Sequence, residues 1–277
     1  MKQRLYSIDA IRSLAMVLVI IVHTKGYFFS SDNSPLIFCL LKVLGTVGVP
    51  LFVILTGYLM IHRNYETDDY LKNFISNNLI PLFVAYEIWN IVWNIFRYTH
   101  LIDEPKKWID VLFAALFMGD TQSALWYLPM TIALYLGLPI VSVICHRIIQ
   151  LNYQKILFIF LLLSGTIIPS ISDLFMLVGK NLNIHSVFNM NIFGASVWGE
   201  SAWMIYLLSG HAIYKGKLKI IKTYVLVILG VLLPFGIMYR LELTGKSVQN
   251  YNFILVILLS ISLFEILRVC ETFSVNS

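Results

Sequence analysis

The residues of this sequence best suited to chemistry are Arg12 and His23, which lie in one apolar segment near the N-terminus. In a helix of 3.6 residues per turn, their separation is about 20° beyond three full turns and about 16 Å along the axis. They are therefore expected on one helix face. His23 can act as a general base near neutral pH, and Arg12 suits phosphate recognition. Asp9 is close enough along the helix to pair with Arg12.

The composition indicates an all-α, polytopic transmembrane helical bundle. Of the 277 residues, 58% are hydrophobic and 13% are charged, and the mean hydropathy is +0.79. A soluble domain has about half apolar and a quarter charged residues. The net charge of +5 comes from basic residues in short loops between apolar segments, which fits anchoring beside anionic lipid and does not point to a nucleic-acid partner; none is expected. The three cysteines are isolated, so neither a disulfide framework nor a metal site is expected.

We expect about eight to nine membrane spans. The segment 108–118 is apolar but too short to cross, and would be interfacial or re-entrant unless it forms the ninth span. The second expected helix contains Gly45 and Gly48, which permit close helix approach, and Pro50, which predicts a kink. The eight expected helices cover approximately residues 9–29, 36–61, 79–96, 124–145, 156–171, 192–213, 224–239 and 251–267.

The distribution of basic residues predicts that both termini lie in the cytoplasm. Arg12 is then at the cytoplasmic face, and His23 lies past the middle of the membrane. A cytoplasmic donor with a phosphate head and a long thin arm, such as acyl-coenzyme A, would be held at Arg12 while its reactive end reaches His23. We expect both side chains to point into one polar tunnel. The alternative is that Arg12 is only an edge anchor and His23 an outer-edge polar residue.

Other ionisable residues in expected spans are functional candidates, because charges inside a membrane are costly. Glu87 is the deepest of them. Glu200 lies near an outer end, where a purely interfacial position is equally consistent with the sequence. Glu265 and Arg268 are three residues apart on one helix, and we expect them to form a structural ion pair.

The spacing of Arg12 and His23 resembles the Arg-x10-His signature of the acyltransferase family 3 membrane proteins, which acylate cell-surface sugars and related acceptors. Three further blocks resemble family elements in order and position, at residues 49–59, 125–139 and 206–210. The resemblance covers most of the chain. The family's closing helix would begin about where this sequence ends, so we expect a C-terminally shortened member.

The resemblance implies that His23 is the catalytic histidine and that Arg12 helps to bind the acyl donor. The family usually has an Arg-x-x-Arg pair before its third helix, and this sequence has Phe74 and Asn77 there, with Lys72 as the nearby cation. Donor binding is accordingly expected at Arg12, Asp9 and Lys72, and substrate binding at Glu87, Trp126, Tyr127 and Glu200. On base rates, Trp126 and Tyr127 are equally consistent with interfacial belt residues.

We therefore expect one domain over residues 1–277, a multi-pass O-acyltransferase of the cell membrane. It would move an acyl group from cytoplasmic acyl-coenzyme A to a hydroxyl of a glycan or lipid-linked sugar, and acetyl is the acyl group that we expect. No permanently bound cofactor or metal is expected. His23 would either deprotonate the acceptor or carry the acyl group. Two alternatives stay open: a non-enzymatic polysaccharide exporter, and the membrane domain of an amino-acid racemase or uptake system.

Overall fold

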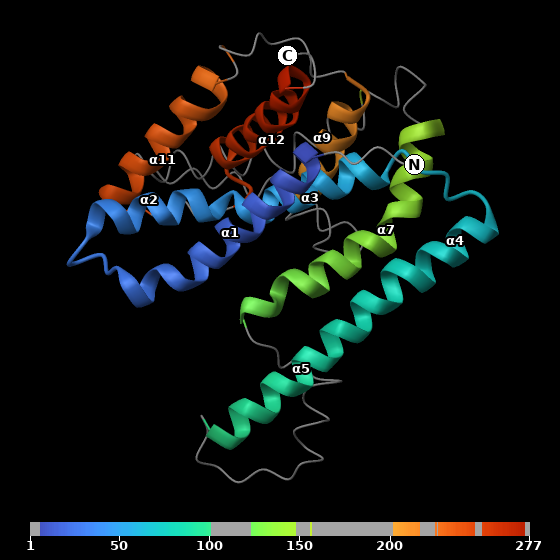
Figure 1. The fold of residues 1–277 in the computed structure, drawn as a ribbon, viewed down its shortest axis with the longest axis horizontal. Helices are drawn as coiled ribbons and strands as arrows, with labels where there is room; N and C mark the ends of the chain where they lie inside the picture. The colour runs from blue at the N-terminus through green and yellow to red at the C-terminus, as the bar shows by residue number, and fades with distance from the viewer. Residues whose placement is uncertain are drawn as a thin grey trace. The chain divides into compact units, whose positions relative to one another are not determined.

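The computed structural model describes residues 6–100, 123–147, 202–216, 227–246 and 251–274, together with positions 156 and 225, and all regular structure in these ranges is helical. The chain divides into two compact units, residues 1–62 with 149–277 and residues 63–148. The first contains α1 (Tyr6–Phe28), α2 (Pro35–Thr46), α3 (Gly48–Met60), α9 (Ala202–Tyr214), the turn η6 (Ile228–Leu232), α11 (Leu233–Leu243) and α12 (Ile254–Ser274). The second contains α4 (Asp68–Phe74), the turn η1 (Ile75–Leu79), α5 (Ile80–His100), the turn η2 (Ser123–Trp126) and α7 (Tyr127–Arg147) (Figure 1).

Within the described ranges, four helical stretches are long and apolar enough to cross a membrane. They are Tyr6–Phe28, Pro35–Met60, Asp68–Phe96 and Tyr127–Arg147, and they correspond to the first four expected spans. The third begins earlier than expected, because the polar segment before residue 79 is already helical and runs through α4 and η1 into α5. The expected total of eight to nine spans stays a prediction, and the expected segments 108–118 and 156–171 lie outside the described ranges, apart from the single position 156.

Prolines explain where these helices are interrupted. Pro50 has no N–H for the carbonyl of Thr46, and the helix expected over 36–61 divides nearby, at Val47, into α2 and α3. The kink expected at Pro50 stays a prediction. The widened turns η1 and η6 end two residues before Pro81 and Pro234 respectively. The proline ring clashes with the carbonyl four residues earlier, and a wider turn relieves that clash.

One face of α1 packs against α2 and α3, beside which it runs in Figure 1. A Cβ atom added at Gly45 would lie 2.6 Å from Val22 Cβ, and one at Gly48 would lie 3.1 Å from the Ala15 carbonyl oxygen. The close helix approach expected at these two glycines is therefore confirmed. The buried stripe of α1 consists of Ser7, Ile8, Ile11, Ala15 and Leu18.

The crossing of α3 and α9 is closer still, because each helix presents a glycine to the backbone of the other. A Cβ atom at Gly57 would lie 1.8 Å from the Leu207 carbonyl oxygen, and one at Gly210 would lie 2.0 Å from the Ile54 carbonyl oxygen. Neither position has room for a side chain. The two backbones therefore touch directly, with no side chain between them.

An aromatic cluster joins the C-terminal ends of α3 and α9 to α12. The His62 ring, just after α3, stacks on Tyr214 with 4.0 Å between ring centres. Tyr58 contacts Tyr214 edge to face at 5.6 Å and lies 5.8 Å from Phe264 of α12. These contacts place the C-terminal ends of α3 and α9 beside the middle of α12.

In the second unit, α7 runs antiparallel to the stretch formed by α4, η1 and α5. Ser142 Oγ donates a hydrogen bond to the Arg63 carbonyl oxygen at 3.0 Å, and the Tyr135 and Phe74 rings lie 5.9 Å apart. The two contacts show the direction: residue numbers increase along the α4–α5 stretch from Arg63 to Phe74, while they decrease along α7 from Ser142 to Tyr135. The Tyr65 phenol lies beside this contact, and burial raises its pKa.

We predict that Gly57→Ala and Gly210→Ala each lower the melting temperature of the detergent-solubilised protein by several degrees. Each added methyl group must push two backbones apart, and overpacking of this kind costs about 1–3 kcal/mol or more. The matched control is Gly236→Ala in α11, where an added Cβ meets nothing within 4 Å. The control is expected to melt at or slightly above the wild-type temperature. Wild-type stability of both crossing variants would contradict this packing.

Candidate functional site

Arg12 and His23 lie on the exposed side of α1, away from its buried stripe. The intervening positions Met16 and Ile20 follow at helical spacing and are also exposed, 55% and 54% respectively. This common face agrees with the eleven-residue spacing. Both side chains are exposed, and the polar tunnel expected between them stays a prediction.

Asp9 contacts Arg12, with 3.4 Å between Oδ1 and Nη1. Asp9 lies in the first turn of α1, where the helix dipole favours a carboxylate. The side chains are 38% and 51% exposed, so the pair contributes at most about 1 kcal/mol to stability. The pair matters mainly because it orients the Arg12 side chain: the Asp9 carboxylate holds the guanidinium near the first turn of the helix.

The other candidates, except Glu200, belong to the second unit. Lys72 is exposed on α4, Glu87 lies on α5, and Trp126 and Tyr127 lie where η2 meets α7. The structure therefore brings Asp9, Arg12 and His23 together on α1, and it places the remaining described candidates on the α4–α5 and α7 pair. Glu200 lies outside the described residues.

Glu87 is the most unusual of these groups. Its side chain is half-buried, and its Oε2 atom is buried with no hydrogen-bond partner among the described residues. An unpaired carboxylate oxygen in an apolar helix is costly, and such groups in membrane proteins mark functional sites by default.

The two aromatic candidates form one contact. The Trp126 and Tyr127 rings are nearly perpendicular, at 87°, with 6.4 Å between their centres. Thr131 Oγ1 donates to the Tyr127 carbonyl oxygen at 2.8 Å, one turn into α7. Both rings are half-buried, so each presents part of its surface to its surroundings.

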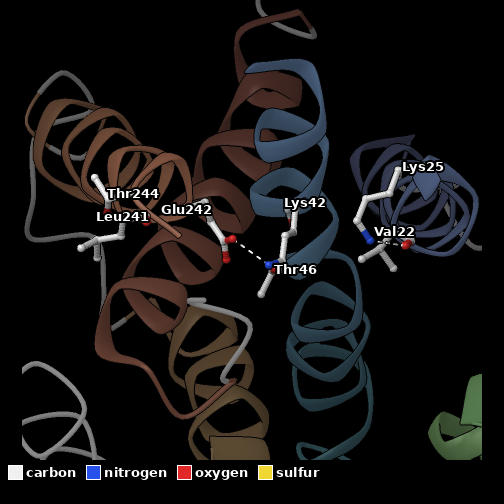
Figure 2. Close-up of polar contacts among 7 residues, drawn as sticks. All are labelled: Val22, Lys25, Lys42, Thr46, Leu241, Glu242 and Thr244. Carbon is white, nitrogen blue, oxygen red and sulfur yellow. Dashed lines mark hydrogen bonds and ion pairs between the residues drawn. The ribbon is translucent and has the colours of Figure 1, made fainter. Parts of the chain in front are cut away.

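The structure also reveals an ion pair that sequence reasoning missed. Lys42 of α2 and Glu242 of α11 approach to 2.7 Å between Nζ and Oε2, and their side chains are only 18% and 4% exposed (Figure 2). The only signal of this pair in the sequence was the presence of one lysine, Lys42, in an apolar segment. Its partner lies 200 residues away, so only tertiary structure identifies the pair.

Lys25 of α1 is the second lysine in this part of the first unit (Figure 2). Its Nζ donates to the Val22 carbonyl oxygen at 2.7 Å and lies 5.7 Å from the centre of the Phe38 ring, within cation–π range. Thr46 Oγ1 donates to the Lys42 carbonyl oxygen at 2.9 Å. The Lys25–Phe38 contact joins α1 to α2, and the Lys42–Glu242 pair joins α2 to α11; the other two contacts lie within a single helix.

We predict that Glu242→Gln lowers the free energy of unfolding by about 3–5 kcal/mol, because it leaves the Lys42 ammonium buried without its counter-charge. Thermal melting in detergent measures the effect. The double variant Lys42→Met with Glu242→Met is expected to recover most of the loss, since it removes both charges.

The matched control is Glu66→Gln, which breaks the exposed pair between Glu66 and Arg147. Exposed pairs contribute about 0–1 kcal/mol, so its melting temperature should stay close to wild type. Equal effects of Glu242→Gln and Glu66→Gln would show that the Lys42 pair is not buried in the folded protein.

A search of curated proteins finds similarity to an amino-acid racemase of Enterococcus faecalis, 29% identical over 135 residues. The aligned region covers 47% of this chain and 18% of the racemase, so the chain spans less than a fifth of that relative's length. No solved structure matches the chain.

The whole-chain comparison agrees with the pattern around Arg12 and His23. The family described as "Acyltransferase domain" matches residues 5–273, which include both helical units and nearly the entire sequence. The described ranges contain four apolar helices long enough to cross a membrane, in keeping with a membrane-embedded member. The chain therefore belongs to acyltransferase family 3, as its sequence pattern predicted.

Proposed function

We propose that this protein is a membrane-bound O-acyltransferase that moves an acetyl group from cytoplasmic acetyl-coenzyme A to a hydroxyl of a cell-surface sugar or polysaccharide. Family membership supports the acyl-transfer chemistry. The donor, the acceptor and the location in the cell membrane, with both termini in the cytoplasm, are parts of this proposal.

The observation that carries the proposal is the arrangement of α1. Arg12 and His23 share its exposed face, and Asp9 contacts Arg12 at the first turn. At 1.5 Å per residue, the two side chains start about 16 Å apart along the helix. A donor with phosphates at one end and a thioester at the end of a long arm matches that separation.

The reaction follows from these positions. Arg12 binds donor phosphate through its guanidinium, which presents several N–H donors in a fixed plane. The neutral His23 imidazole accepts the proton of the acceptor hydroxyl as the oxygen attacks the thioester carbonyl. A C–O bond forms, the C–S bond breaks, and the proton passes from His23 to the departing thiolate. In the alternative route, His23 first takes the acyl group and then passes it to the acceptor oxygen.

A second candidate function is the membrane part of an amino-acid racemase or uptake system. The similarity to the Enterococcus faecalis racemase favours it, although that similarity covers only 135 residues. A protein of this kind would act on amino acids and would need no acetyl-coenzyme A. Membranes carrying the chain can be assayed for both activities side by side.

We predict that His23→Ala lowers transfer of radiolabelled acetyl from acetyl-coenzyme A to the membrane glycan fraction by at least about a hundredfold, the usual contribution of a general base. The amount of folded protein should stay the same, because His23 is exposed. The matched control is His146→Ala in α7, which should transfer acetyl as wild type does. Its ring nitrogen contacts the Ser142 carbonyl oxygen at 2.8 Å. Full transfer by His23→Ala would overturn the proposed role of His23.

We predict that Arg12→Ala raises the KM for acetyl-coenzyme A about tenfold or more, because it removes charged hydrogen bonds to phosphate. Arg12→Lys, which keeps the charge but loses the planar fork, should lie between Arg12→Ala and wild type. Arg147→Ala, at an exposed arginine of α7, is the matched control and should leave the KM unchanged. An unchanged KM in Arg12→Ala would exclude Arg12 from donor binding.

A further inference from the structure

One end of the first helical unit is built where the C-terminal end of α1, the start of α2 and the C-terminal half of α11 meet. Lys25 of α1 lies 5.7 Å from the centre of the Phe38 ring of α2. The Tyr239 hydroxyl of α11 donates a hydrogen bond to the Leu36 carbonyl oxygen of α2 at 3.3 Å. His23 lies two residues before Lys25, and we therefore call this the His23 end of the unit.

Three cations at the His23 end have no carboxylate partner among the residues described, and together we call them the cationic rim. They are Lys25, Arg240 and Lys246. Lys25 is half-buried and donates to the Val22 carbonyl oxygen at 2.7 Å. Arg240 is exposed in the last turn of α11, and Lys246 is exposed in the turn that follows this helix. The rim therefore offers N–H donors and positive charge at an accessible surface.

The other ionisable groups described at this end leave the positive charge uncancelled. Lys42 and Glu242 neutralise each other at 2.7 Å, beside Lys25 (Figure 2). Asp32 is exposed between α1 and α2, and it accepts a hydrogen bond from Ser31 at 3.2 Å. In the described part of this end, three unpaired cations therefore outnumber a single unpaired carboxylate.

The proposed function places this charge on the side from which the acceptor arrives. Arg12 would bind the donor at the cytoplasmic side, and His23 lies about 16 Å further along α1. Basic residues are enriched on the cytoplasmic side of membrane proteins, so topology alone gives no reason for a cationic rim at the opposite end. An anionic ligand gives such a reason, because complementary charge guides a ligand to its site and fixes its register.

We infer that the cationic rim binds the acceptor of the acyl transfer through phosphate or carboxylate groups, so that the acceptor is an anionic glycan. This inference rests on the proposed function and adds the substrate class of its acceptor. The planar guanidinium of Arg240 suits a phosphate or carboxylate, and the Lys246 ammonium adds a compact charge nearby. Lys25 is only about 3 Å from His23 along the helix axis, so it holds an anion at the level of the candidate base.

Two other roles compete with this inference. Lys25 and Arg240 lie in the last turns of α1 and α11, where a cation stabilises the helix dipole. Cations at a membrane boundary also attract anionic lipid headgroups. The first role changes stability, and the second changes the affinity for anionic vesicles. Only the inferred role changes the affinity for a soluble anionic glycan.

The test uses the full chain purified in detergent and two matched pairs of oligosaccharides. Tetragalacturonate is compared with its methyl ester, which lacks the carboxylate charges, and a phosphorylated mannan oligosaccharide is compared with its dephosphorylated form. Titration calorimetry measures the Kd of each. The wild-type chain should bind the charged member of at least one pair about tenfold or more tighter than the neutral member, and this preference should weaken with added salt.

The double variant Arg240→Gln with Lys246→Gln is expected to raise the Kd for the charged oligosaccharide about tenfold or more, because charge-assisted hydrogen bonds are lost. Lys25→Gln should weaken binding in the same direction. The matched control is Arg147→Gln with Lys215→Gln, which removes the same charge at exposed positions of α7 and after α9, outside the rim. It should bind as wild type does.

The acetyl-transfer assay supplies the second measurement. The KM for the charged acceptor should rise in the rim variant, while the KM for acetyl-coenzyme A should stay within about twofold of wild type in both double variants. Arg240 and Lys246 are exposed, so both variants are expected to fold. Thermal melting in detergent checks this directly.

The inference would be overturned by equal affinity for charged and neutral oligosaccharides, by wild-type affinity in the rim variant, or by a wild-type chain that binds neither charged oligosaccharide. A lower melting temperature with unchanged affinity would assign the rim to helix ends instead. Weaker capture by vesicles of phosphatidylglycerol and phosphatidylcholine, again with unchanged glycan affinity, would assign it to lipid. Charge-dependent binding without any acetyl transfer would refute the proposed function and leave the rim in place. Acetyl transfer to neutral glycans alone would do the reverse.

Discussion

The first helical unit depends on one contact, the crossing of α3 and α9 at Gly57 and Gly210, where backbone meets backbone. Lipid gives apolar helices little reason to associate, so close van der Waals packing must hold them together. The same α2–α3 stretch receives α1 at Gly45 and Gly48. Because these glycines determine which face of α1 is buried, they also leave the face with Arg12 and His23 exposed. Helix packing and the candidate site therefore share a single structural cause.

Buried charge is the second organising feature, and it is handled differently in the two units. In the first, Lys42 and Glu242 neutralise each other at 2.7 Å and connect α2 to α11. In the second, Glu87 has a buried oxygen without a partner among the described residues. A paired carboxylate suits structure, and an unpaired one suits a ligand. The contrast explains why Lys42 and Glu242 are assigned to stability.

Several features could be predicted from the sequence because they depend on local chain geometry. Helical spacing alone put Arg12 and His23 on one face and Asp9 beside Arg12. The ion pair expected between Glu265 and Arg268, three residues apart on α12, is confirmed at 2.7 Å. Family membership could also be predicted from the sequence, because the signature residues and the later blocks keep their order along the chain.

Other features needed the folded chain. Lys42 and Glu242 are 200 residues apart, and periodicity cannot pair groups on different helices. The sequence suggested close approach at Gly45 and Gly48, but not the meeting of Gly57 with Leu207. The burial of Asn90 and Asn94 was also invisible, since an apolar helix shows little contrast between lipid-facing and protein-facing sides. By itself the sequence determined the approximate positions of the first four spans, the face shared by Arg12 and His23, and the family. Only tertiary structure decided which faces are buried, because that depends on partners distant along the chain.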